Sequence, residues 1–174
     1  VCMDIIAPEF LEGFDNPLDG LAEILNDNQW PFDRPSDDRM NFEVYSDGHN
    51  YRFSLIWEEA EASMRVNCKP GIKIHKNSHQ SVYALLNRVN AQLGIGAFIV
   101  EGEGDLIFRY TTLFRGISAS GADHVEAIVD TGVEQCTLYL DLFRSYQSPA
   151  GFANDNPGVQ MDLGLILART LGNA

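Results

Sequence analysis

The sequence predicts an α+β fold in the order helix, three strands, helix, two strands, helix, with one antiparallel sheet backed by the helices. Apolar residues recur at helical spacing in three stretches and at every second position in the stretches between them. Short clusters of turn-forming residues join neighbouring strands, as in hairpins of antiparallel sheets. The chain has 174 residues, of which 45% are hydrophobic, so it is large enough for one domain with its own core.

The first helix is predicted to begin at Asn16 and Pro17, because asparagine is a favoured N-cap and proline suits the first helical position. Its apolar residues at helical spacing are Leu18, Leu21, Ile24 and Leu25. The segment from Gln29 to Met40 contains two prolines and several charges. We expect it to be an irregular connection that Trp30 and Phe32 attach to the core.

Three strands are predicted between residues 41 and 70, where the apolar period changes to two. The turn Asp47-Gly48-His49-Asn50 predicts a hairpin. If the two-residue loop is Asp47-Gly48 or Gly48-His49, each even-numbered residue of one strand pairs with an odd-numbered residue of the other. That register places the following residues on one face: Phe42, Val44, Tyr51, Phe53 and Leu55. A slip by one residue would expose the whole set, at about 1.5–3 kcal/mol for each large side chain.

The second half of the chain repeats the alternation of helix and hairpin. A helix is predicted from Ser78 to Leu93, with Gly94 ending it. A hairpin follows, with strands over residues 97–101 and 106–114. Ser120 is then a candidate cap for a long helix. The apolar stripe of that helix is Val125, Ile128, Val129, Val133, Cys136, Leu140 and Phe143.

The chain is predicted to divide into three parts. Residues 1–15 form an N-terminal extension, residues 16–147 a single α+β domain, and residues 148–174 a linker with a short amphipathic tail. The linker is assigned from its Pro, Gly, Asn and Ala content. The tail is assigned from the spacing of Leu163, Ile166, Leu167 and Leu171. We expect this tail to dock on its own domain or to fray, and the alternative is that it reaches a neighbouring molecule.

Charge and cysteine content predict a cytoplasmic protein that binds neither nucleic acid nor membrane. Asp and Glu number 25 against 12 Lys and Arg, a formal charge of −13, which repels phosphate backbones and anionic bilayers. Cys2, Cys68 and Cys136 are an odd number at wide spacing, which favours reduced thiols. The first residues lack the pattern of a signal peptide, and the longest apolar runs are far shorter than the roughly 20 residues of a membrane helix.

Two strings resemble hydrolase motifs. Ile128-Val129-Asp130-Thr131-Gly132 is similar to the catalytic loop of aspartic proteases, but it lies within a helical pattern and has no second copy. That chemistry needs two carboxylates that share a proton, and a homodimer could supply the second one. Gly116-Ile117-Ser118-Ala119-Ser120 lacks the last glycine of a nucleophile elbow. A small hydrolase that uses Asp130 or Ser118 therefore stays open as an alternative.

No cofactor or metal is predicted. Gly94-Ile95-Gly96 lacks the third glycine of a dinucleotide loop and leads into a strand instead of a helix. Cys68, His75 and His79 do not have the spacing of a closed zinc site.

The second face of the predicted sheet gathers four basic residues, which are Arg52, Arg65, Lys69 and Arg109. Ion pairs with Glu43 and Glu58 would explain them, at about 0.2–1 kcal/mol for each exposed pair. The alternative is a binding face for an acidic or extended partner, with Tyr45 and Ile56 as apolar contacts. Because helices cover the other face, this face and the sheet edges would be available for a partner.

The order of elements, the Trp30 segment, the turn Asp47-Gly48-His49-Asn50 and the run Tyr51–Trp57 together resemble the YbjN family of bacterial sensory transduction regulators. The resemblance spans residues 16–147 and brings no catalytic residues. That family is similar in fold to type III secretion chaperones, which are small, acidic, usually dimeric proteins that hold an extended segment of another protein. The resemblance implies that dimers form through the second helix and the strand after it.

Together these observations predict a non-enzymatic module that binds a protein or peptide segment, in a chaperone-like or regulatory role, as a homodimer. The alternatives are the small hydrolase and a small-ligand sensor, which a stabilising ligand would reveal.

Overall fold

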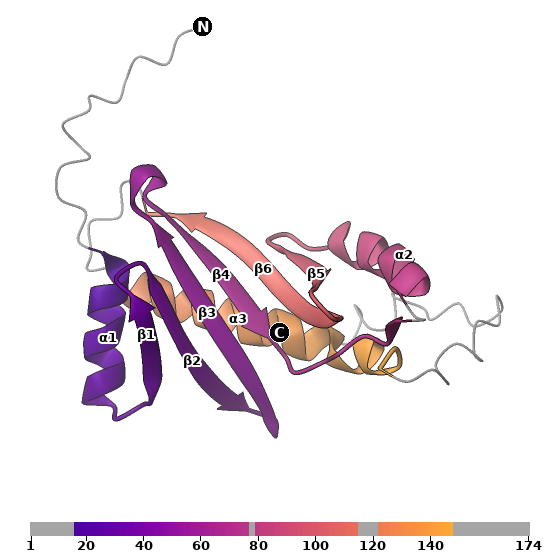
Figure 1. The fold of residues 1–174 in the computed structure, drawn as a ribbon, viewed down its shortest axis with the longest axis horizontal. Helices are drawn as coiled ribbons and strands as arrows, with labels where there is room; N and C mark the ends of the chain where they lie inside the picture. The colour runs from indigo at the N-terminus through magenta and orange to yellow at the C-terminus, as the bar shows by residue number, and fades with distance from the viewer. Residues whose placement is uncertain (1–15, 77–78, 115–121, 148–174) are drawn as a thin grey trace, which may run out of the picture.

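The computed structural model describes residues 16–76, 79–114 and 122–147, and it has the predicted α+β fold. Six antiparallel strands form one sheet in the order β1-β2-β3-β4-β6-β5 (Figure 1). The elements are α1 (Pro17–Asp27), β1 (Phe32–Ser36), β2 (Arg39–Ser46), β3 (His49–Glu58), a 3₁₀ turn (Glu59–Glu61), β4 (Ser63–Lys69), α2 (His79–Asn90), β5 (Ala97–Glu101), β6 (Asp105–Leu113) and α3 (Ala122–Arg144).

Helix α1 begins where the sequence predicts. Asn16 Oδ1 accepts a hydrogen bond of 3.0 Å from the Leu18 backbone N–H, and Pro17 occupies the first turn. Leu18, Leu21 and Leu25 are buried in the core, so one stripe of the helix faces the rest of the protein.

The predicted irregular connection between α1 and the sheet is wrong, because residues 32–36 form the edge strand β1. Phe32 pairs with Phe42 and packs against the core, as expected. Trp30 does not, since 54% of it is exposed. The sequence pattern did not predict this strand because it is short and contains Pro35, which an edge strand tolerates. Its register is also irregular after Asp33.

The predicted hairpin and its register are confirmed. Ser46 pairs with His49, so the loop is Asp47-Gly48, and both loop residues have positive φ, as a type I′ turn requires. Phe42 pairs with Phe53 and their rings stack at 5.3 Å.

Helix α2 ends at Asn90, four positions before Gly94, so the predicted stop is wrong. The Asn90 side chain instead bonds strand β5: its Nδ2 donates to Phe98 O at 2.9 Å, and its Oδ1 accepts from Phe98 N at 2.8 Å. The glycine with positive φ in this connection is Gly96, where an added Cβ would lie 2.7 Å from the Phe108 ring.

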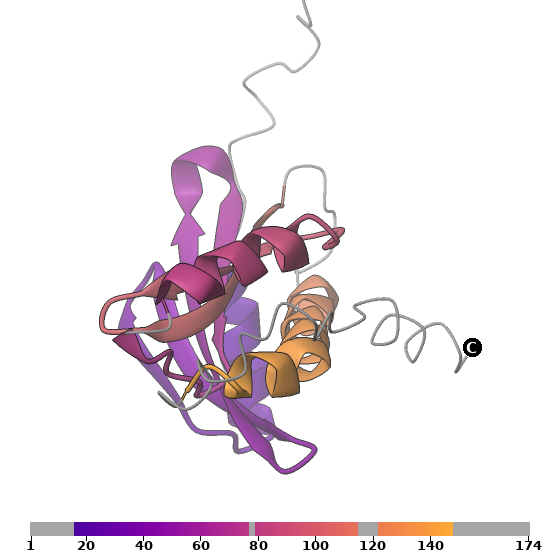
Figure 2. The same cartoon turned by 90° about the vertical axis from the view of Figure 1, so that its right-hand side faces the viewer.

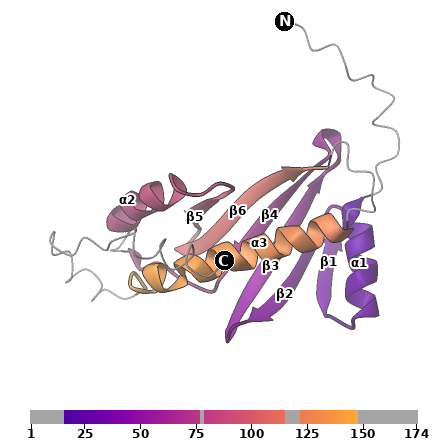
Figure 3. The same ribbon diagram turned by 180° about the vertical axis from the view of Figure 1, so that it is seen from behind.

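Helix α3 crosses one face of the sheet, as the views from the front and from behind show (Figures 1 and 3). Helix α2 lies at the β5 end (Figure 2). Four residues of the predicted α3 stripe are buried, namely Ile128, Cys136, Leu140 and Phe143. The two others that the structure describes, Val129 and Val133, are partly buried. Ser120 and the side chain of Val125 lie outside the described residues. No described helix has the length and apolar character needed to cross a membrane.

Two tyrosines attach α3 to the sheet. The Tyr51 hydroxyl on β3 lies 2.7 Å from Thr137 Oγ1, and the Tyr110 hydroxyl on β6 donates to Ile128 O. Burial raises the pKa of both tyrosines, so both hydroxyls keep their protons.

Gly132 is the point of closest approach between α3 and the sheet. A Cβ at this position would lie 2.9 Å from Phe53 Cε1 and 3.4 Å from Cys68 Cβ. Real side chains do not pack at the first of these distances, so the helix sits this close because residue 132 has no side chain.

We therefore expect Gly132→Val to lower the free energy of unfolding by about 1–3 kcal/mol, because overpacking outweighs the better helix propensity of valine. Denaturant unfolding followed by tryptophan fluorescence measures the change. The control is Gly94→Ala, since an added Cβ there meets nothing within 4 Å. A Gly132→Val protein as stable as the wild type would contradict the close approach.

Candidate binding groove on the sheet

The four basic residues that the sequence singled out do lie on the face opposite α3. The strand register pairs Arg52 with Lys69, and Asn67 with Arg109. Arg65 pairs with Ile56 on the same face. The residues that alternate with them, such as Phe53 and Cys68, are buried toward α3.

Three of these four basic side chains form ion pairs. The distances are 2.8 Å from Arg65 Nη2 to Glu58 Oε1, 3.9 Å from Lys69 Nζ to Asp105 Oδ2, and 2.5 Å from Arg109 Nη2 to Glu101 Oε1. Arg109 Nε also donates to Asn67 Oδ1 at 2.7 Å. Ion pairing therefore accounts for these three residues, although Glu43 is not among their partners.

One buried apolar residue lies on the otherwise polar face, between partners of two of these ion pairs. Ile107 is only 1% exposed although it points away from α3. Its neighbours on β6 are Arg109 and Asp105, whose ion pairs reach to Glu101 and Lys69 respectively. Long basic side chains can cover neighbouring apolar surface with their aliphatic stems, and Arg109 is the next residue after Ile107 on this face of β6.

Arg52 differs from the other three. Its side chain makes no hydrogen bond or ion pair with any residue in the described ranges, and it is exposed. Glu43 lies directly across the strand pair, but its Oε2 accepts from Asn50 Nδ2 at 2.8 Å. The guanidinium of Arg52 is therefore available for a ligand.

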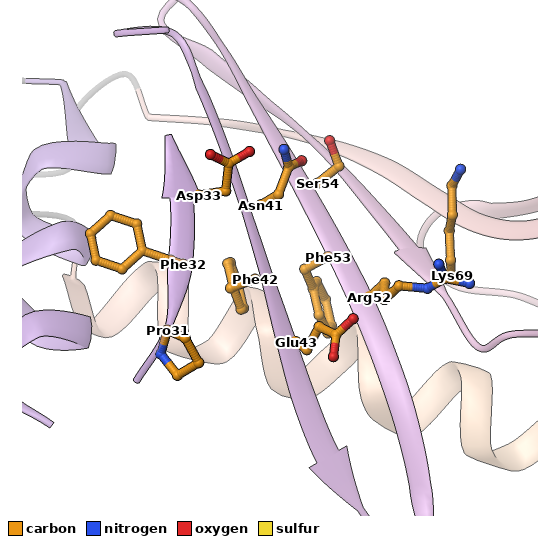
Figure 4. A pocket seen from close by; sticks show the side chains of 10 residues that line it. All are labelled: Pro31, Phe32, Asp33, Asn41, Phe42, Glu43, Arg52, Phe53, Ser54 and Lys69. Atoms are coloured by element: carbon orange, nitrogen blue, oxygen red, sulfur yellow. The ribbon is translucent and has the colours of Figure 1, made fainter. Parts of the chain in front are cut away.

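Arg52 lines a groove of about 590 Å³ that extends over strands β1 to β4. Figure 4 shows its side chains in two rows. Asp33, Asn41 and Ser54 form one row, and Glu43, Arg52 and Lys69 form the other, as the register requires. Pro31, Phe32, Phe42 and Phe53 complete the lining.

Sequence reasoning named Arg52, Lys69 and, as an ion-pair partner, Glu43, but it missed Asp33, Asn41 and Ser54. Asp33 was missed because β1 was not predicted as a strand. Asn41 and Ser54 could have been found, since they occupy the same alternation as Glu43 and Arg52. A polar residue on a sheet face is common, however, and the pattern alone does not single them out.

Tyr45 and Ile56, the two apolar contacts that the sequence predicts, lie on this face but far apart. Tyr45 pairs with Asn50, six residues from Ile56 along β3, which corresponds to about 20 Å. Tyr45 is 76% exposed and lies two residues beyond Glu43, on the same face. Ile56 lies beyond the row that contains Ser54, between Arg39 and Arg65.

The sheet edges are less available than the sequence suggested. On β5, the Asn90 side chain already forms hydrogen bonds with the backbone N–H and C=O of Phe98. At the other edge, Arg34 of β1 forms an ion pair of 2.5 Å with Asp19 of α1.

The hydrolase candidates gain no support from their positions. Asp130 is exposed on α3, and Thr131 Oγ1 donates to Ala127 O at 2.8 Å within the helix. An Asp-Thr-Gly string within a helix does not have the loop conformation of an aspartic protease. Ser118 lies outside the described residues. Within the described ranges, no three His, Cys, Asp or Glu residues gather as a metal site.

The comparisons with known proteins agree with this architecture. The model of the YbjN family, described as "Putative bacterial sensory transduction regulator", matches residues 17–145. No curated protein sequence matches the chain. The crystal structure of "YbjN, a putative transcription regulator from E. coli" superposes with a TM-score of 0.52 at 14% identity, and the match covers 74% of this chain and 88% of that one. At this identity the likeness concerns the fold.

The structure also predicts a role for Asn90. We expect Asn90→Ala to destabilise the protein by about 1–3 kcal/mol, because the Phe98 N–H and C=O lose their partner. Hydrogen exchange should show a less protected Phe98 amide. Asn87→Ala is the control, since Asn87 is exposed on the same helix. Equal protection of the Phe98 amide in both variants would refute this role.

Proposed function

The chain belongs to the YbjN family of bacterial regulators, and on this premise we propose that it is a non-enzymatic cytoplasmic module that binds an extended protein segment in a regulatory or chaperone-like role. The observation that carries the proposal is the Arg52 groove, on the sheet face opposite α3. The groove crosses several strands, so it offers an extended chain a succession of polar contacts.

Arg52 supplies the specific contact of this proposal. An unpaired guanidinium binds a carboxylate through two parallel hydrogen bonds, which lysine does not do. Lys69 stands beside it in the same row, although Asp105 partly neutralises it. The segment is therefore expected to bring one carboxylate to Arg52, from an acidic side chain or from a chain terminus.

The rest of the groove limits the charge of the segment. Asp33 and Glu43 lie in the lining, and the chain as a whole carries a formal charge of −13. A strongly acidic segment would be repelled at long range. Asn41 and Ser54 suit the backbone amides of an extended chain, since their side chains both donate and accept. The favoured partner is thus a segment of low net charge with one carboxylate.

Charge reversal at Arg52 tests this proposal. We expect Arg52→Glu to weaken binding of such a segment at least about tenfold, because a carboxylate then faces a carboxylate. Partners captured by the wild-type protein are identified first, and binding of the purified partner segment is then measured by calorimetry. Arg39→Glu is the matched control: Arg39 lies on the same face, paired with Ile56, but outside the groove lining.

Equal affinity of the wild type and Arg52→Glu for the segment would refute the groove proposal. The groove volume also falls within the 300–1,000 Å³ of small-ligand sites, which favours the small-ligand sensor as second candidate. A small molecule that raises the melting temperature of the wild type but not of Arg52→Glu, with no protein bound, would select the sensor.

We further propose a homodimer through α2 and β5, by the likeness to secretion chaperones. Asn90 closes the β5 edge at Phe98, so the contact would use the outer side of α2, where Tyr83 is 55% exposed. Light scattering should give twice the chain mass at micromolar concentration, and Tyr83→Glu should shift it to the monomer. Tyr45→Glu, on the sheet face, should leave the dimer intact. A monomeric wild-type protein would contradict the proposal.

A further inference from the structure

Two cysteines that are 68 positions apart in sequence meet in the core. Cys68 lies on β4 and Cys136 on α3, and both are buried. Cys136 Sγ donates a weak hydrogen bond to Cys68 Sγ at 3.5 Å. Both are free thiols, as the sequence predicts, but their wide spacing in sequence did not indicate that they meet.

The contact depends on the close packing of α3 against the sheet. Gly132 lies one helical turn before Cys136, and an added Cβ at Gly132 would be 3.4 Å from Cys68 Cβ. Because Gly132 has no side chain, the α3 backbone can lie close to β4 at Cys68. Phe53, which pairs with Cys68 across the sheet, packs against the same glycine.

We infer that Cys68 and Cys136 form an oxidation site at which a peroxide converts the dithiol into a disulfide that links β4 to α3. The two sulfurs would have to approach from 3.5 Å to about 2.05 Å, which a small change of side-chain torsion in each cysteine can supply.

The two sulfurs have different roles in the reaction. The hydrogen bond to Cys68, together with burial, raises the pKa of the Cys136 thiol, so Cys136 keeps its proton. In the proposed order Cys68 reacts first: its sulfur bonds to one peroxide oxygen, the O–O bond breaks, and the thiol proton leaves with the other oxygen as water, so that Cys68 becomes a sulfenic acid. Cys136 then attacks the sulfenic sulfur, and a second water leaves as the disulfide forms. Two thiols and one hydrogen peroxide thus give one disulfide and two waters.

The burial of both thiols shapes how this site would respond. A buried thiol is protonated and poorly reached, so oxidation is slow and needs sustained peroxide. Once formed, the disulfide is equally shielded from attack by reducing thiols. The dithiol is the resting form in a reducing compartment, and the disulfide closes a long loop, which constrains the unfolded chain.

The test treats the purified full chain with hydrogen peroxide and maps its cysteines by mass spectrometry after proteolysis. The expected product is a peptide pair linked through Cys68 and Cys136 that dithiothreitol separates. The oxidised protein should melt roughly 5 °C or more above the reduced protein. Cys2→Ser, in which only the third cysteine is replaced, should form the same link.

A second variant distinguishes this route from unrelated oxidation. In Cys136→Ala the cross-link is lost and Cys68 should be trapped as a sulfenic acid by a dimedone probe. If that variant does not fold, the wild-type peptide map still decides. Peroxide that leaves both thiols free in the folded wild type, or that links either one to Cys2 instead, would overturn the inference.

Discussion

The whole arrangement depends on how closely α3 packs against the centre of the sheet. Gly132 allows this approach, because any Cβ there would overlap the Phe53 ring. The same contact places the Tyr51 and Thr137 hydroxyls at 2.7 Å and brings Cys136 against Cys68. Side chains of β3 and β4 that point toward α3 are thus committed to the core. The neighbours that alternate with them must point to the opposite face, where the groove forms.

The opposite face is organised by rows of side chains across the strands. In antiparallel pairs, side chains that face each other and those on the diagonal are close enough to interact. Arg65, Lys69 and Arg109 each reach a carboxylate, but Arg109 and Lys69 extend toward β5 and the β5–β6 turn. The charge on the β5 side of the sheet is therefore largely neutralised by these ion pairs, whereas nearer to β1 Arg52 forms no ion pair with any described residue.

Much of the fold could be predicted from the sequence because buried apolar residues recur at the period of the helix or strand that carries them. The register of β2 and β3 followed from the loop length and from which residues must share a face. Strand β1 has no such apolar period, since this edge strand contains Pro35 and few apolar residues. The end of α2 was missed for another reason: Asn90 bonds to Phe98, eight residues later, and a side-chain bond of this kind has no periodic signal. The groove lining was incomplete because it depends on β1, and the meeting of Cys68 with Cys136 depends on tertiary packing alone.

The isolation of Arg52 follows from its position near the hairpin. Glu43 is its direct cross-strand neighbour and would ordinarily pair with it. Asn50, two residues before Arg52 on β3 and thus on the same face, competes for that carboxylate and holds it at 2.8 Å. The type I′ turn at Asp47-Gly48 fixes Asn50 in that place, because it sets the register of both strands. Through Asn50, this short loop therefore determines which side chain bonds the Glu43 carboxylate, and Arg52 makes no hydrogen bond or ion pair with any described residue.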